Sequence, residues 1–218
     1  MVDYAAARLN MVEGQLRTNR ITDPALMGAF LAVPRERFVP AAFKGAAYVD
    51  EDIPLGRGRY LMEPLVLARL IQLADLGREE RALFVGAASG YGAAVLAQIA
   101  ASVVALESEP ALAEMARRAC GELGYGNVSV VEGPLDKGHG GGAPYHAILF
   151  GGAIADAPAA LVRQLAEGGR MVAVLKPDSA VGKATLMRRS GTVLSRRPAF
   201  DAATPMLPGF APEPSFVF

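Results

Sequence analysis

Two glycines and one acidic residue in the middle of the chain have the spacing of a nucleotide-binding turn. In LFVGAASGYG (83–92), Gly86 and Gly90 lie between an apolar run and the apolar positions of a helix. A turn of this kind brings a ligand close to backbone amides and to the positive end of the helix. Glu107 follows Gly86 by about twenty residues, the spacing expected of an acid that binds ribose hydroxyls. The sequence therefore predicts a ribose-containing cofactor; a tight strand-to-helix turn without a ligand is the alternative.

The elements that must position these residues alternate along the chain. Apolar strands are expected at 82–87, 102–107, 127–133, 147–152 and 170–176, and helices at 91–100, 110–123 and 158–169. Apolar strands separated by helices indicate a parallel sheet covered on both faces. We therefore expect an α/β fold with a doubly wound, mostly parallel sheet, and a ligand at the carboxyl ends of its strands.

The two ends of the chain follow other patterns. Helices are expected at 4–18, at 24–33 and from 64 onward, with an irregular stretch between the last two. We expect these residues to form an N-terminal helical cap. After Lys176 the sequence predicts a C-terminal β-hairpin that turns at Ser190 and Gly191, and then a proline-rich tail whose residues 216–218 pack on the sheet. We expect one domain, with residues 1–80 on the substrate side and 81–218 forming the cofactor-binding sheet.

Composition excludes several classes of function. The 22 basic and 22 acidic residues balance, and 52% of the chain is apolar, which argues against a nucleic-acid partner and against disorder. No apolar run has membrane-spanning length, so a cytoplasmic protein without a membrane partner is expected. Cys120 has helical spacing from neighbouring apolar residues and is expected to be a buried filler. With one cysteine and two histidines, His139 and His146, no metal site is predicted.

The chain as a whole resembles the protein-L-isoaspartate O-methyltransferases, from about Met11 to the C-terminus. The resemblance rests on MVEGQLRTNRITDPAL, VPRERFVP, AYVDEDIPLG, GAASGYGAAVLA, NVSVVEG, APYHAIL and PAALVRQLAEGGRMV. It implies a Rossmann-like class I methyltransferase fold and S-adenosylmethionine as cofactor. The implied substrate is an isoaspartyl-containing peptide or protein, or another carboxylate.

The resemblance also implies which residues form the site. The cofactor-binding residues would be Gly86, Ala87, Ala88, Ser89, Gly90, Tyr91, Glu107, Ser108, Pro134, Leu135 and Gly151. On the substrate side, the family motif reads approximately QTISQP, and this chain has RYLMEP at 59–64. Met62 thus takes the place of a serine and Tyr60 that of a threonine, and Glu63 adds an acid. An inward-pointing Glu63 would repel a carboxylate substrate.

The cofactor side departs from the family as well. Phe84 stands where the family has an acid, Ala88 where it has a glycine, and Pro134 where it has another acid; His146 replaces an aspartate. Each lost polar contact is expected to weaken cofactor binding by about 1 kcal/mol. The predicted function is a methyltransferase of the isoaspartyl type. The alternatives are a catalytically impaired homologue that acts as a binding protein, or a methyltransferase with a different acceptor.

Overall fold

The N-terminal region is helical in the computed structural model, which describes residues 2–178 and 180–211. Its helices are α1 (Tyr4–Met11), α2 (Pro24–Ala32) and α3 (Pro64–Ala74). Asp3 caps α1 and Asp23 caps α2 through side-chain hydrogen bonds to backbone amides. The helix predicted over 4–18 is α-helical only to Met11; a π-helical turn (Val12–Leu16) and a 3₁₀ turn (Arg17–Asn19) follow.

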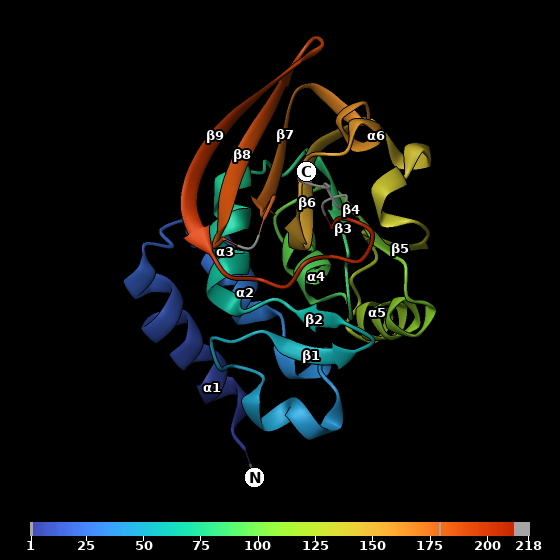
Figure 1. Cartoon of the computed structure of the whole chain (residues 1–218). Coiled ribbons are helices and arrows are strands. Elements are labelled where there is room, and N and C mark those ends of the chain that lie inside the picture. The colour runs from blue at the N-terminus through green and yellow to red at the C-terminus, as the bar shows by residue number, and fades with distance from the viewer. Residues whose placement is uncertain (1, 179, 212–218) are drawn as a thin grey trace, which may run out of the picture.

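A seven-stranded sheet forms the other half of the molecule (Figure 1). Its strands are β3 (Arg81–Val85), β4 (Ser102–Glu107), β5 (Val128–Glu132), β6 (Tyr145–Ile154), β7 (Leu165–Leu175), β8 (Gly182–Ser190) and β9 (Val193–Ala202). The order is β5-β4-β3-β6-β7-β8-β9, parallel through β7, with β8 antiparallel to both of its neighbours. The predicted mostly parallel sheet and C-terminal hairpin are confirmed. The strand order reverses beside β3, which is where ligands bind in such sheets.

Helices and a C-terminal segment cover the two faces of the sheet. Helices α2, α3, α4 (Tyr91–Ala97) and α5 (Pro110–Glu122) pack with Phe84, Leu149 and Val172 in one apolar cluster. On the other face, α6 (Ala159–Val162) packs with Leu83, Val85 and the segment that contains Leu207 and Phe210. Successive residues of β3 therefore point to opposite faces, as the alternation of a strand requires.

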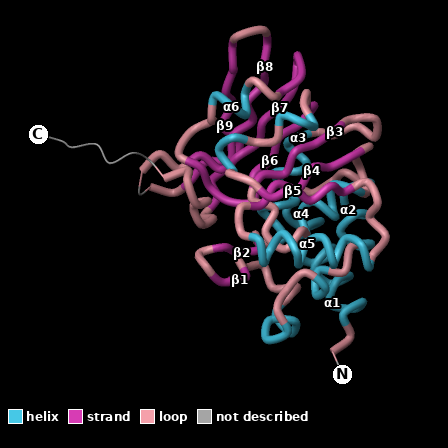
Figure 2. Tube along the Cα trace, turned by 90° about the vertical axis from the view of Figure 1, so that its right-hand side faces the viewer, coloured by secondary structure: helices cyan, strands magenta, loops and turns pink. Residues whose placement is uncertain are grey.

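A short hairpin that the sequence did not predict lies apart from the main sheet (Figure 2). It pairs β1 (Ile53–Gly56) with β2 (Arg59–Leu61) in antiparallel register. The two turn residues, Arg57 and Gly58, both have positive φ, at 51° and 70°. This is the backbone twist that two-residue hairpin turns favour, and it fixes where β2 begins.

The helix predicted over 158–169 is wrong in its second half. Helix α6 ends at Val162, and β7 begins at Leu165, where it pairs with Tyr145 of β6. Pairing with the sheet overrides the helical pattern, and Gly168, with φ 71°, fits an irregular strand better than a helix. The expected packing of residues 216–218 lies outside the described residues. Across those that are described, none of the helices has the length and apolar character needed to cross a bilayer.

Candidate functional site

The glycine turn after β3 has three residues with positive φ. Gly86, Ala88 and Gly90 have φ values of 72°, 53° and 96°. The amides of Gly86 and Ala87 donate to the carbonyl of Leu106, at 2.9 and 3.0 Å, and so tie the turn to β4. Ala88 is the one non-glycine residue of the three, and its Cβ makes a positive φ costly.

The glycines of this region bring parts of the chain into close contact with one another. A Cβ on Gly92 would lie 2.5 Å from the ring of Phe84, and a Cβ on Gly151 would overlap the carbonyl oxygen of Gly86. Phe84, which takes the place of the family acid, therefore packs against the first turn of α4. The space that glycines leave here is used by neighbouring protein groups.

Glu107, the predicted ribose-binding acid, is fully buried at the end of β4. Its Oε2 accepts from the amide of Ala88 at 2.6 Å, and its Oε1 accepts from the amides of Ser108 and Glu109 at 2.9 and 3.1 Å. Arg59 of β2 adds two further bonds: Nη2 lies 2.7 Å from Oε2, and Nε lies 3.2 Å from Oε1. Both carboxylate oxygens are thus occupied by groups of the chain itself.

Arg59 contacts Glu107 beside the glycine turn, at the end of the sheet where ligands bind in such folds; we call this place the cofactor crevice. A Cβ on Gly86 would lie 3.1 Å from Arg59 Nη2 and 2.7 Å from Cδ2 of Leu207. Leu207 is held there because its amide donates to the carbonyl of Ala153 at 2.8 Å. Figure 1 shows this C-terminal segment, in red, passing β2 on its way from β9 to β6. Hairpin and C-terminal segment therefore meet over the glycine turn.

The remaining space is too small for a cofactor in this arrangement. About 10 Å³ remains between Tyr60, Met62, Phe84, the glycine turn and Gly151, which is room for one water molecule at most. The residue types suit S-adenosylmethionine, since a glycine turn, backbone amides and an acid at the end of the neighbouring parallel strand are present. Their arrangement does not fit it, because Arg59 and Leu207 lie directly against Gly86, on the turn that the ligand would have to approach.

On the substrate side, Tyr60 and Met62 line this narrow space, and Glu63 does not. Met62 is only 3% exposed. Its carbonyl accepts from Nη2 of the buried Arg35 at 2.8 Å, and Arg35 Nε donates to the carbonyl of Ala47 at 2.7 Å. Arg35 therefore fixes the segment that carries Met62, although burial lowers the pKa of its guanidinium.

Glu63 belongs to a separate group of acids. Its amide donates to Asp52 Oδ1 at 2.9 Å, at the start of α3. Partial burial, together with Asp50 and Asp52 nearby, raises the pKa of Glu63 to about 7. Near neutral pH the side chain is therefore only partly ionised, which reduces the repulsion of a carboxylate.

The other predicted cofactor residues are spread around the turn. Ser89 and Tyr91 are fully buried, and the Tyr91 ring lies under Arg35, whose guanidinium carbon is 4.7 Å from the ring centre. Gly90 precedes α4 as its N-cap. Ser108 follows Glu107 directly, and its hydroxyl lies 3.4 Å from that carboxylate.

Pro134 and Leu135 follow β5, and they do not line the narrow space beside the glycine turn. Leu135 packs with Leu106 and Leu161 on the face covered by α6. Of the predicted cofactor residues, Gly86, Ala87, Ala88 and Gly151 line that space together, whereas Glu107 does not line it and is bound by Arg59.

His146 lies at the opposite end of the sheet from this site. It is the second residue of β6, and its Nδ1 accepts from the amide of Arg81, where β3 begins. Its replacement of an aspartate therefore does not belong with the changes around the cofactor crevice. Cys120 is buried, as predicted, and burial raises its pKa to about 11. Within the described residues, no group of three His, Cys, Asp or Glu side chains could hold a metal ion.

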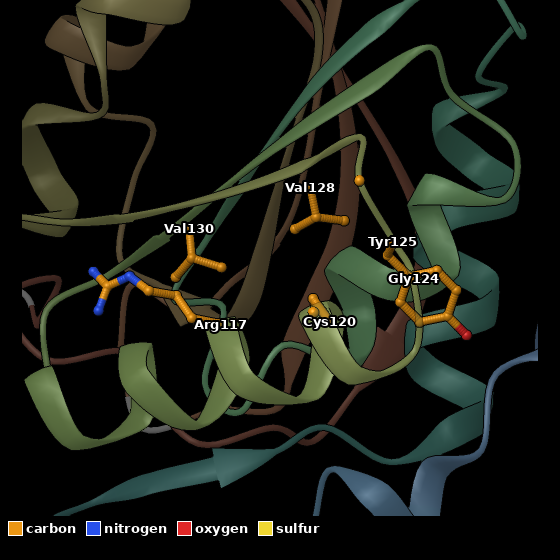
Figure 3. A pocket seen from close by; sticks show the side chains of 8 residues that line it. Arg117, Cys120, Gly124, Tyr125, Val128 and Val130 are labelled. Atoms are coloured by element: carbon orange, nitrogen blue, oxygen red, sulfur yellow. The ribbon is translucent and has the colours of Figure 1, made fainter.

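A larger hollow, of about 310 Å³, lies between α5 and β5 (Figure 3). Arg117 lies at one end and Tyr125 at the other, with Val128 and Val130 between them. Arg117 Nη2 is 2.6 Å from Glu132 Oε1, so its charge is already paired. The hollow shares no lining residue with the glycine turn or with Glu107.

Sequence reasoning missed three residues that shape the site: Arg35, Arg59 and Leu207. Arg35 lies in the quoted segment VPRERFVP, but nothing in that segment shows that it is fully buried. Arg59 stands at the position of the family glutamine, and this replacement was the available signal. Leu207 lies in a proline-rich stretch that carries no periodic pattern.

Comparison with known proteins connects this site to a family. The sequence profile described as Protein-L-isoaspartate(D-aspartate) O-methyltransferase (PCMT) matches residues 7–197. The chain is 43% identical over 186 residues to a protein-L-isoaspartate O-methyltransferase of Methylorubrum populi, covering 84% of each chain. It is 39% identical over 187 residues to protein-L-isoaspartate O-methyltransferase 1 of Rhodopseudomonas palustris, covering 86% of this chain and 76% of that one.

A solved protein-L-isoaspartate O-methyltransferase has the same fold, with a TM-score of 0.85 at 24% identity; the match covers 94% of this chain and 67% of that one. The profile match includes both the hairpin that carries Arg59 and strand β4, which ends at Glu107. The chain therefore belongs to the protein-L-isoaspartate O-methyltransferase family.

Proposed function

We propose that this chain is an S-adenosylmethionine-dependent methyltransferase that esterifies the carboxylate of isoaspartyl residues in peptides or proteins. The observation that carries the proposal is the family match: the profile covers residues 7–197, and two members are 39% and 43% identical to this chain over 187 and 186 residues. The turn and Glu107 occur in the order and at the sheet position that a cofactor of this type requires. A binding protein without catalysis is less well supported, since the comparisons favour the enzyme.

In this proposal the two parts of the chain divide the work. Residues 1–80 supply the substrate side through Tyr60, Met62 and Glu63, and residues 81–218 supply the sheet with Glu107. A carboxylate is already ionised at neutral pH, so the site needs no general base. The chain's task is to orient that carboxylate and to exclude water from it. The buried, apolar Met62 suits the exclusion of water. We place this activity in the cytoplasm.

The test is methyl-ester formation on a matched pair of peptides. One peptide contains an isoaspartyl residue, and the other has the same sequence with an ordinary aspartyl residue. Purified protein and labelled S-adenosylmethionine at a high concentration should yield base-labile label on the isoaspartyl peptide alone. Equal labelling of both peptides, or of neither, would contradict the proposed acceptor.

A second candidate keeps the cofactor and changes the acceptor. It is favoured by one observation: the apolar Met62 lies, nearly inaccessible, where the family has a serine. The double variant Met62→Ser with Pro134→Asp restores the two family residue types. If it gains activity toward the isoaspartyl peptide, the acceptor of the first proposal is supported. If it stays inert while the same preparation methylates another carboxylate, the second candidate replaces it.

A further inference from the structure

The ion pair between Arg59 and Glu107 is built from groups that a cofactor would need free. Glu107 is fully buried and Arg59 is 3% exposed, so neither side chain reaches water in this arrangement. Three backbone amides already bind the carboxylate from the protein side, and Arg59 takes the side that faces the crevice. A ribose that bound this acid would have to occupy the place of the guanidinium.

We propose that Arg59 is a built-in competitor of the cofactor for Glu107, and that it determines how tightly this chain binds S-adenosylmethionine and its demethylated product. The inference rests on the proposed function, since it concerns the cofactor of that reaction. The chain binds its cofactor only in the fraction of molecules in which Arg59 has left Glu107. The apparent dissociation constant is therefore the intrinsic constant divided by that fraction.

The position of Arg59 allows it to leave. It begins β2 in a hairpin that forms its own two-stranded sheet and shares no backbone pairing with the seven-stranded sheet. The exposed end of the hairpin is held by an ion pair between Arg57 Nη1 and Glu109 Oε1, at 3.2 Å. Since the Arg57 side chain is 76% exposed, water and salt weaken that contact. Ile53 and Leu61 of the same hairpin are buried in the core, so the movement that frees Glu107 is that of the turn and of the Arg59 side chain.

Leu207 is the second side chain that lies against the glycine turn, and its contacts there are apolar. It packs against Gly86 and Gly152, and it makes no polar contact with Glu107 through its side chain. Displacing Leu207 costs apolar packing. Displacing Arg59 separates the two buried charges of the Arg59–Glu107 ion pair. Breaking a buried ion pair is the more costly of the two changes. Arg59 should therefore control affinity more strongly than Leu207.

The test is calorimetric titration of the full chain with S-adenosylhomocysteine, comparing wild type with Arg59→Gln. Glutamine is the residue of the family motif at this position, and its shorter, neutral side chain frees the crevice side of Glu107. We expect Arg59→Gln to lower the dissociation constant by about ten-fold or more. Leu207→Ala should lower it by a smaller factor.

Arg57→Gln is the matched control. It removes the same charge from the same hairpin at an exposed position, and it should change the dissociation constant by no more than about two-fold. Thermal unfolding of each variant, with and without S-adenosylhomocysteine, reports folding and binding independently of the titration heat. A ligand-dependent rise in midpoint that is larger for Arg59→Gln than for wild type supports the inference.

Two results would overturn it, and they are distinguishable. If wild type and Arg59→Gln bind equally tightly, Arg59 is no competitor, while the proposed methyltransferase function stands. If neither Arg59→Gln nor Leu207→Ala binds S-adenosylhomocysteine although both are folded, the inference fails together with the cofactor of the proposed function.

Discussion

Replacing Glu107 by glutamine is the perturbation whose effect follows most directly from the structure. Within the described part of the chain, the hydrogen bonds of the Arg59 guanidinium go to Glu107. Glu107→Gln keeps the size of the side chain and removes its charge. It leaves a buried guanidinium without a counter-charge and turns an amide donor toward backbone N–H groups that need an acceptor.

The expected cost is large for a single substitution. Removing one partner of a buried ion pair destabilises a protein by about 3–5 kcal/mol. For a chain of this size, each kcal/mol lowers the unfolding midpoint by about 2–4 °C. Arg59→Met should cost less, because Glu107 keeps its bonds to the amides of Ala88, Ser108 and Glu109.

Urea denaturation of four proteins measures these terms: wild type, Glu107→Gln, Arg59→Met, and the double variant. The double variant should be more stable than the sum of the two single losses predicts, because the unpaired charge that each single variant leaves is absent from it. If Glu107→Gln costs less than about 1 kcal/mol, or if the two effects simply add, the pair is not the buried, mutually dependent contact described above.

Three further changes test other parts of the site. Ala88→Gly should stabilise the fold by about 1 kcal/mol in urea denaturation, because Ala88 has φ 53°; an unchanged or lower stability would mean that the turn is not strained there. Gly92→Ala should destabilise by about 1–3 kcal/mol, since its Cβ would lie 2.5 Å from the Phe84 ring, and a neutral result would show that the ring is free to move. The pKa of Glu63 is about 7 in the folded chain, against an ordinary value of 4.5. Between these pH values the folded state holds a proton on Glu63 that the unfolded state has lost, so the free energy of unfolding falls as pH rises through this range. The free energy of unfolding of Glu63→Gln, relative to that of wild type, should therefore be higher at pH 8 than at pH 5. The same difference at both pH values would contradict the raised pKa.

The sheet and the glycine turn could be predicted because their signals are local. Each parallel strand is an apolar run bounded by turn residues, and the prolines at the first turns of α2, α3 and α5 mark where those helices begin. The second half of the helix predicted over 158–169 is a strand because β6 offers a pairing partner. That partner lies far away in sequence, and its effect exceeds the weak helix propensity of the segment.

The closed crevice could not be predicted for a different reason. Arg59 and Glu107 are 48 positions apart, and no periodic pattern connects them. Their contact depends on the turn at Arg57 and Gly58, which begins β2 at the residue that faces Glu107. Leu207 depends in the same way on the pairing of Met206 with Ala153. The residue types of a cofactor site were readable from the sequence, whereas the side chains that fill it depend on long-range packing.

A crystal structure of this protein grown with S-adenosylhomocysteine would test most directly whether the cofactor and Arg59 compete for Glu107. We expect the ligand's ribose hydroxyls to contact the Glu107 carboxylate and the Arg59 guanidinium to have moved out of hydrogen-bonding distance. A bound ligand beside an Arg59–Glu107 pair still at 2.7 Å would contradict it.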